Sequence, residues 1–278
     1  MQNFNDYIKI SKKIDGWFDI DAARIFYYLN STQKKENISG NIFEIGVHHG
    51  KSSLLLGMFI EPDNNKLIVN DIFDQQEHNI SKSGFGSEQI FKKNFKKFFK
   101  TENGLEIIVK PSNKLTLNDT TNECIFFSID GGHSSEETYI DLVTAKNAIS
   151  KEGMIAIDDY FNSGFPGVSE GVCRFLIENE DIVPWIYCFN KMILIRKDML
   201  KKYDEILKRN DFDQFCYKNN YFIDKVTFFA NDVMIFKKRT NSRALLLLIR
   251  NKLSKYSIFK KIFPLILKVF PSIRKTKV

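Results

Sequence analysis

The chain has 278 residues, of which 43% are hydrophobic, and a formal net charge of +7. This length and apolar content suit one large domain, or a domain with an appendage. The four cysteines are scattered with no CxxC pair, which disfavours a disulfide framework or a thiolate zinc site and fits a cytoplasmic protein. The opening "MQNFNDYIKISKK" lacks the apolar core of a signal peptide, and we expect no membrane-spanning segment.

The positive charge is concentrated near the C-terminus. Residues 241–278 hold ten lysines and arginines and no acidic residue, so subtracting ten from +7 leaves −3 for residues 1–240. Enzymes that act on nucleic acids usually carry positive charge around the active site, so we expect no nucleic-acid partner. We divide the chain into a domain, 1–240, with an N-terminal helical cover over about 1–38, and a basic amphipathic tail, 241–278.

Short apolar runs alternate with helical patterns along the domain. After a helical cover over about 3–35, strands are predicted at 41–46, 66–73, 105–112, 124–130 and 154–160, with helices at 51–60, 87–100 and 134–150. The runs "PWIYCFNKMILIRK" and "KVTFFANDVMIFKK" are predicted to complete a seven-stranded sheet, with an antiparallel hairpin at one edge. This alternation predicts an α/β fold with a mainly parallel sheet flanked by helices.

Ligands of such sheets bind outside the carboxyl ends of the strands. The first strand is followed by "EIGVHHGKSS", in which Gly46 and Gly50 allow a tight turn and Ser52 begins a helix. The spacing E-x-G-x-x-x-G differs from the G-x-G-x-x-G of dinucleotide folds. The carboxylate of Glu44 would repel a pyrophosphate but suits a ligand that carries an ammonium group.

The next two strands also end in polar side chains. Asp71 follows the second strand, where it could accept hydrogen bonds from two ribose hydroxyls, and Ser112 follows the third. A nucleoside with a cationic group and no phosphate is S-adenosylmethionine, which is the cofactor we predict.

Three aspartates end the fourth and fifth predicted strands. Asp130 stands in "SIDGGHSSEE", and Asp158 and Asp159 stand in "GMIAIDDYFNSGFPGV". The ends of adjacent parallel strands lie within about 5 Å of each other. Carboxylates so close repel one another unless something positive stands nearby. The alternative is that Asp158 and Asp159 are solvated loop residues, one of them capping a turn.

The motifs together resemble a known family. The blocks "GWFDIDAARIFYYL", "GNIFEIGVHHGKSSLLL", "VNDIFDQQEHNISKSGFGSEQIFKKNF", "IDGGHSSEETYIDL" and "GMIAIDDYFNSGFPGV" stand in order within roughly residues 15–200. They resemble class I S-adenosylmethionine-dependent methyltransferases, which have a Rossmann-like fold. Within that superfamily they resemble the macrocin O-methyltransferase-like group of metal-dependent sugar O-methyltransferases. "HSSE" departs from the "HSYE" usual in this group, which we interpret as a packing change at Ser135.

The resemblance implies site residues. The cofactor site would be lined by Glu44, Gly46, Gly50, Ser52, Asp71, Ser112 and Asp130. The metal site would consist of Asp130, Asp158 and Asp159, which are hard-oxygen ligands suited to Mg²⁺ or Mn²⁺. A bound ion would lower the pKa of a sugar hydroxyl, and His133 beside it would take the proton. Asp130 and His133 are thus the expected catalytic residues; the alternative for His133 is that it only orients an aspartate or the substrate.

Two further features surround this predicted site. His48 and His49 resemble a metal-binding pair, but adjacent residues in a turn are expected to point apart, so we expect no metal there and place His49 near the cofactor or substrate. The polar loop "DQQEHNISKSGFGSEQ" is predicted to form a lid, and Tyr160 and Phe161 to offer surfaces for a sugar ring.

The predicted function is Mg²⁺-dependent O-methylation of a sugar hydroxyl, in surface polysaccharide or glycan biosynthesis. A phenolic or catechol-like acceptor is the main alternative, and an NAD-dependent dehydrogenase or a non-catalytic membrane-surface module are the others. Apolar and basic residues alternate in the tail, which predicts attachment to anionic lipid at the inner face of the membrane. The alternative is a tail that packs on the body or across a homo-oligomer.

Overall fold

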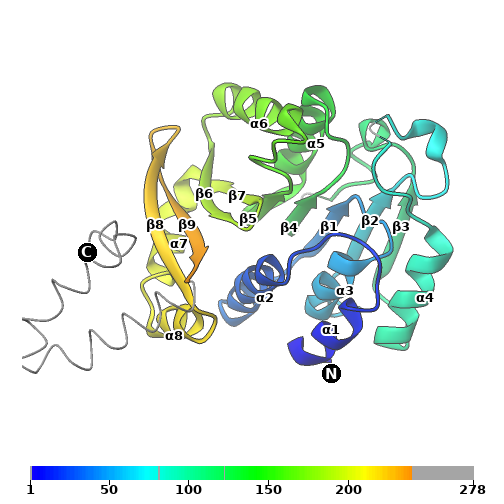
Figure 1. The fold of residues 1–278 in the computed structure, drawn as a ribbon, viewed down its shortest axis with the longest axis horizontal. Helices are drawn as coiled ribbons and strands as arrows, with labels where there is room; N and C mark the ends of the chain where they lie inside the picture. Colours follow the sequence, from blue (N-terminus) through cyan, green and yellow to red (C-terminus); the bar gives the residue numbers. More distant parts are fainter. Residues whose placement is uncertain (1, 81, 122, 240–278) are drawn as a thin grey trace, which may run out of the picture. The chain divides into compact units, whose positions relative to one another are not determined.

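A computed structural model describes residues 2–80, 82–121 and 123–239 (Figure 1). The chain divides into two compact units. The first contains the described residues up to Ile206 together with Lys225–Ile235. The second contains Leu207–Asp224 and the described residues from Phe236 onward. All the residues predicted to form the site belong to the first unit.

The sheet has nine strands in the order β3-β2-β1-β4-β5-β7-β6-β9-β8. Among the first five strands of this order, β3, β2, β1, β4 and β5, each pairs in parallel with the next. β7 is antiparallel to both β5 and β6. The strands are β1 Asn41–Ile45, β2 Leu67–Asp71, β3 Leu105–Val109, β4 Cys124–Ile129, β5 Ile149–Ile157, β6 Ile182–Cys188, β7 Lys191–Arg196, β8 Tyr221–Phe228 and β9 Asn231–Lys238. The predicted α/β fold with a mainly parallel sheet and an antiparallel edge is confirmed.

The strand count differs from the prediction because each of the last two apolar runs folds into two strands. The turn between β6 and β7 places Phe189 and Asn190 at φ 46° and 75°, and the turn between β8 and β9 places Phe229 and Ala230 at φ 48° and 56°. Two-residue hairpin turns of this kind need positive φ at both positions and usually contain glycine. Neither run contains glycine, so each one looks like a single continuous strand in the sequence.

Helices cover both faces of the sheet in the first unit (Figure 1). Phe26 of α2 packs on Phe126 of β4, with ring centroids 4.9 Å apart. The next residue, Phe127, points to the opposite face because side chains alternate along a strand, and it joins a core with Leu142 of α5 and Val172 of α6. The helices are α1 Phe4–Ser11, α2 Ile20–Lys35, α3 Lys51–Leu56, α4 Glu88–Phe99, α5 Ser135–Ala148, α6 Pro166–Glu178, α7 Leu200–Ile206 and α8 Asn210–Lys218.

The ends of β1, β4 and β5 are held in register just beyond the strands. The N–H of Asp130 donates to the carbonyl of Ile45 at 2.8 Å, and that of Asp158 donates to the carbonyl of Ile129 at 2.9 Å. Gly46, at φ +82°, passes so close that a Cβ there would lie 1.8 Å from the carbonyl oxygen of Asp130. Only glycine fits at this position, and its close approach brings the glycine loop into contact with Asp130, one of the two predicted catalytic residues.

None of the described helices has both the length and the apolar character needed to cross a bilayer. The predicted tail, 241–278, lies outside the described residues.

Candidate active site

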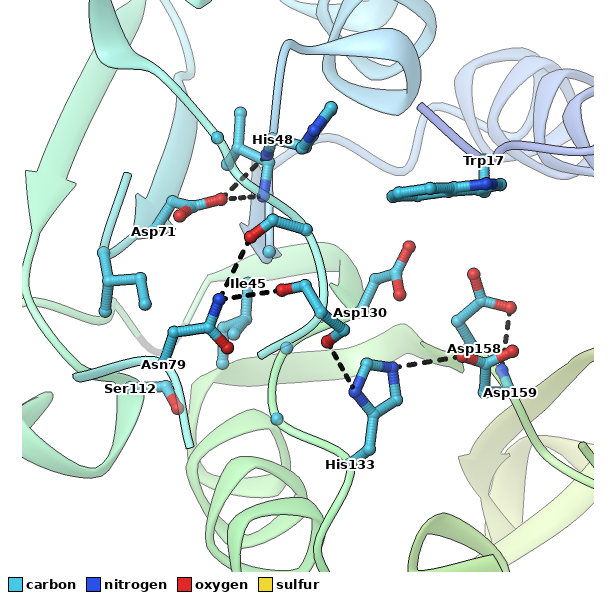
Figure 2. Close-up of a pocket in the computed structure, with 18 of the residues that line it drawn as sticks. Trp17, Ile45, His48, Asp71, Asn79, Ser112, Asp130, His133, Asp158 and Asp159 are labelled. Carbon is cyan, nitrogen blue, oxygen red and sulfur yellow. Dashed lines mark hydrogen bonds and ion pairs between the residues drawn. The ribbon is translucent and has the colours of Figure 1, made fainter. Parts of the chain in front are cut away.

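A cavity of about 1470 Å³ opens at the carboxyl ends of the strands (Figure 2). Its walls come from the loops after β1, β2, β3, β4 and β5, from the segment between α1 and α2, and from the turn between β6 and β7 together with Lys191. The predicted site residues that line it are Gly46, Ser52, Asp71, Ser112, Asp130, His133, Asp158 and Asp159. The topology thus gathers side chains that are far apart in the sequence.

Asp71 organises the glycine loop at one side of the cavity. Its Oδ2 accepts the N–H groups of Val47 at 2.6 Å and His48 at 2.8 Å, and its Oδ1 accepts that of Phe73 at 2.6 Å. Figure 2 shows the first two bonds crossing from β2 to the loop after β1. A carboxylate has about four lone-pair positions, so Asp71 retains acceptor capacity for a ligand in the cavity.

The structure does not bring two of the predicted cofactor residues, Glu44 and Gly50, to the cavity. Glu44 is fully buried, and its carboxylate accepts the hydroxyl of Ser53. Burial raises the pKa of Glu44 to about 7, against the lowering effect of the serine hydroxyls. Gly50 packs on α4, because a Cβ there would lie 2.5 Å from the ring of Phe91. Both residues pack behind the glycine loop, on the side away from the cavity. The prediction that Glu44 binds an ammonium group is therefore wrong.

A buried lysine supplies the positive charge between the aspartates. The ammonium group of Lys191, the first residue of β7, forms an ion pair with Asp158, and the two side chains are only 6% and 12% exposed. Burial and the charge of Asp158 raise the pKa of Asp130, while Lys191 opposes this rise. Burial alone would lower the pKa of Lys191, but Asp158 and Asp130 hold it above its usual value. One cation therefore serves two facing carboxylates.

Asp159 holds the imidazole of His133. Nε2 of His133 lies 3.1 Å from Asp159 Oδ2, and Nδ1 lies 3.2 Å from the hydroxyl of Ser83 (Figure 2). The amides of Asn162 and Asn190 donate to the other oxygen of Asp159 at 2.8 and 2.5 Å. Although burial opposes it, these hydrogen bonds lower the pKa of Asp159 to about 2. Asp159 is thus a fixed anion that orients His133.

Of the groups of described side chains that could hold a metal ion, the one beside His133 differs in one member from the predicted set. Ligand atoms of Asp130, His133 and Asp159 all lie within 4.8 Å of one another, whereas Asp158 is ion-paired with Lys191. Lys191 was missed because it stands inside a run that looks like one continuous strand. It directly follows the two-residue turn of the hairpin that the sequence hides.

Two segments form the mouth of the cavity. The large side chains of Trp17, Ile80 and Phe85 line it and are 78%, 74% and 67% exposed. The last two lie in the loop predicted to form a lid, whose Ser83 reaches His133. Tyr160 is buried and, like Phe161, does not line the cavity, so the prediction that these rings face a sugar is wrong.

Phe165, from the same loop as Tyr160, does line the cavity. Its ring stacks on the imidazole of His133, with centroids 3.9 Å apart. The loop after β5 therefore faces the cavity, as predicted, but with a different aromatic side chain.

The two adjacent histidines of the glycine loop face each other. The ring centroids of His48 and His49 are 3.9 Å apart. The expectation that they point apart is therefore wrong: His48 takes a left-handed conformation, φ 53°, which turns the chain between them.

Residues 43–160 match the family model Methyltransf_24, described as a methyltransferase domain. This match, on a chain with this fold, confirms the predicted enzyme class, an S-adenosylmethionine-dependent methyltransferase. No curated protein matches the sequence.

Solved structures give the same fold. The O-methyltransferase NovP is 15% identical over 64% of this chain and 80% of its own, with a TM-score of 0.55. The methyltransferase PaMTH1 of Podospora anserina, solved with S-adenosylhomocysteine (SAH) bound, is 16% identical over 70% and 88%, with a TM-score of 0.51. At these identities the likeness shows a shared fold.

Proposed function

We propose that this protein transfers a methyl group from S-adenosylmethionine to a sugar hydroxyl in the biosynthesis of a glycan or surface polysaccharide. The observation that carries this proposal is that His133, held by Asp159, faces the same cavity as the glycine loop and Asp71. A cofactor site and a proton acceptor that share one cavity suit transfer to a hydroxyl, which must lose its proton. The sugar acceptor rests on the resemblance to the macrocin O-methyltransferase-like group.

Four residues that line the cavity, Gly46, Ser52, Asp71 and Ser112, would form its cofactor half. Asp71 would accept the ribose hydroxyls through the capacity that the loop N–H groups leave free. Asp130 lies where the glycine loop crosses the end of β4, between this half and His133.

The tautomer of His133 follows from its partners. An ionised carboxylate only accepts hydrogen bonds, so Nε2–H of His133 donates to Asp159 and Nδ1 carries the lone pair. In this structure Nδ1 accepts the hydroxyl of Ser83. A substrate hydroxyl in the place of Ser83 would give its proton to Nδ1 as its oxygen attacks the methyl carbon. An O–CH₃ bond forms, the S–CH₃ bond breaks and SAH leaves, while Asp159 stabilises the imidazolium.

The residues near His133 fit a divalent cation. Lys191 acts on two carboxylates, Asp158 and Asp130, and the third, Asp159, is bound by His133 and two amides. Negative charge is thus left uncompensated in a mostly buried place. We propose that Asp130 and Asp159 hold Mg²⁺ or Mn²⁺, and that Asp158 joins them when its ion pair with Lys191 opens. The ion supplies Lewis-acid activation of the substrate hydroxyl when bound.

The acceptor would enter past Trp17 and Phe85, whose exposed rings offer apolar surface beside the polar groups of the cavity. Such a rim also suits a flat phenolic or catechol-like ring. An aromatic acceptor is therefore the second candidate.

Calorimetry and methyl transfer test the proposal. S-Adenosylmethionine and SAH should each bind at one site per chain and NADH should not; the reverse result would show a dehydrogenase. Purified protein with labelled cofactor should methylate sugars in preference to catechols, should lose activity in EDTA and should regain it with Mg²⁺. Mass spectrometry of glycan from a strain without the gene should show the loss of one methyl group. Full activity in EDTA would remove the metal from the proposal, and preference for catechols would replace the sugar.

A further inference from the structure

A second group of metal-ligating side chains lies at the rim of the cavity. A carboxylate oxygen of Asp15 and one ring nitrogen each of His48 and His49 all lie within 4.8 Å of one another. Asp15 belongs to the segment between α1 and α2, and the histidines belong to the glycine loop. These residues are distinct from the carboxylates around His133.

The backbone brings the two imidazoles together. Adjacent side chains normally diverge, but the left-handed conformation of His48, φ 53°, places its ring against that of His49. Few residues other than glycine adopt this conformation, and those that do are concentrated at functional sites. The same residue donates its N–H to Asp71, which fixes the turn.

One of these ring nitrogens has no partner. Nδ1 of His48 is buried and makes no hydrogen bond with any residue that the structure describes. The backbone of Gly16 closes over it, since a Cβ on Gly16 would lie 3.2 Å from this nitrogen. A buried polar atom without a partner is costly and calls for an explanation such as a bound ion.

We propose that Asp15, His48 and His49 form a binding site for a divalent transition-metal ion of the Zn²⁺ class. Two imidazoles and one carboxylate favour Zn²⁺, Co²⁺ or Ni²⁺ over Mg²⁺, which prefers oxygen ligands. The ion ties the segment between α1 and α2 to the glycine loop. It thereby fixes Trp17, two residues after Asp15, at the mouth of the cavity. The site does not depend on methyl transfer.

The two tryptophans give this site a spectroscopic signal. The ring of Trp17 lies 5.7 Å from that of His48, whereas Trp185 is buried and donates to Asp204. Co²⁺ should therefore quench the fluorescence of Trp17 selectively. We expect the quenching in the full-length protein with Mg²⁺ present in excess, and its loss in Trp17→Phe. Quenching that persists in Trp17→Phe would overturn the proposal.

Variants measured by Zn²⁺ calorimetry locate the ligands. His48→Asn keeps a residue that tolerates positive φ but removes the imidazole, and His49→Gln and Asp15→Asn remove the other ligands. Each histidine variant should weaken Zn²⁺ binding by roughly tenfold or more, and Asp15→Asn should weaken it less. Since Asp15 is exposed, that variant remains informative even if a loop variant unfolds.

Two matched variants serve as controls. His78→Ala removes one of the other two histidines of the chain, and Asp159→Asn disables the carboxylate cluster. With Mg²⁺ in excess to occupy the carboxylate cluster, both should bind Zn²⁺ at this site as tightly as the unchanged protein. Undiminished binding in His48→Asn and His49→Gln, or its loss in Asp159→Asn, would contradict the assignment.

Discussion

Replacing Lys191 by methionine tests the charge arrangement at the end of the sheet. The change keeps a long apolar side chain in β7 but removes the only cation that the structure places against Asp158 among the described residues. Asp158 and Asp130 then face each other in a mostly buried place with no positive neighbour. The folded protein must hold two repelling carboxylates or take up a proton.

The burial of the pair sets the size of the effect. Removing one partner of a buried ion pair typically costs about 3–5 kcal/mol, because the other charge remains without compensation. For a protein of this size that corresponds to a fall in Tm of roughly 6–20 °C. The ion pair of Lys66 and Glu106 is the control, since their side chains are 58% and 43% exposed. Lys66→Met should cost at most about 1 kcal/mol.

Thermal unfolding in EDTA, and again with Mg²⁺, measures these differences. The double variant Lys191→Met, Asp158→Asn should recover most of the lost stability, because it removes both charges together. Mg²⁺ should stabilise Lys191→Met more than the unchanged protein, because Asp158 becomes available as a ligand. Lys191→Met could prove as stable as Lys66→Met, or the double variant could prove less stable than Lys191→Met alone. Either result would show that the ion pair of Lys191 and Asp158 does not compensate the buried charge.

Three further predictions test separate parts of the account. Asp71→Asn should weaken SAH binding by about tenfold or more, since hydrogen bonds to a charged group contribute roughly 1.5–3 kcal/mol; unchanged affinity would move the cofactor elsewhere. Glu44 has a folded pKa of about 7 against an ordinary 4.5, so the folded state holds a proton that the unfolded state has released between these values. This contribution to stability is complete below the lower value and is lost as the pH rises through the higher one, by about 3 kcal/mol in total. Urea unfolding at about pH 5 and about pH 8 should show this loss, and a smaller one in Glu44→Gln; equal losses in the two proteins would contradict it. The tail, 241–278, should make the full-length protein sediment with anionic liposomes at low salt, whereas protein ending near Thr240 should stay in solution and remain folded. If the full-length protein ignores such vesicles, or if truncation unfolds the body, the tail is a structural element.

The sequence predicted the parts of the site that depend on strand ends. Apolar runs locate β1, β2, β4 and β5, and parallel pairing then brings Asp71, Asp130 and the Asp158–Asp159 pair to one edge. The prediction for Glu44 failed because the sequence did not reveal the direction of its side chain. Glu44 is the second-last residue of β1, where residues alternate between faces, and its carboxylate points into the body instead of the cavity.

Turn geometry accounts for the other differences. Phe189 and Asn190 make a hairpin turn without glycine, which hides both the extra strand and the role of Lys191. The left-handed conformation of His48 likewise leaves no signal in "GVHHG", although it brings two imidazoles together. Ser83 reaches His133 from a loop whose path no local pattern predicts.

Methyl transfer by His133→Gln, compared with the unchanged protein at saturating S-adenosylmethionine, tests whether His133 is the general base. Glutamine keeps a hydrogen-bonding side chain but cannot accept the proton of a hydroxyl. If His133 is the base, turnover with a sugar acceptor should fall by about 10²–10⁴, while the affinity for SAH, measured by calorimetry on both proteins, stays the same. Turnover that survives the change would show that His133 only orients its neighbours. Failure of both proteins to bind the cofactor would contradict the placement of the active site in this cavity.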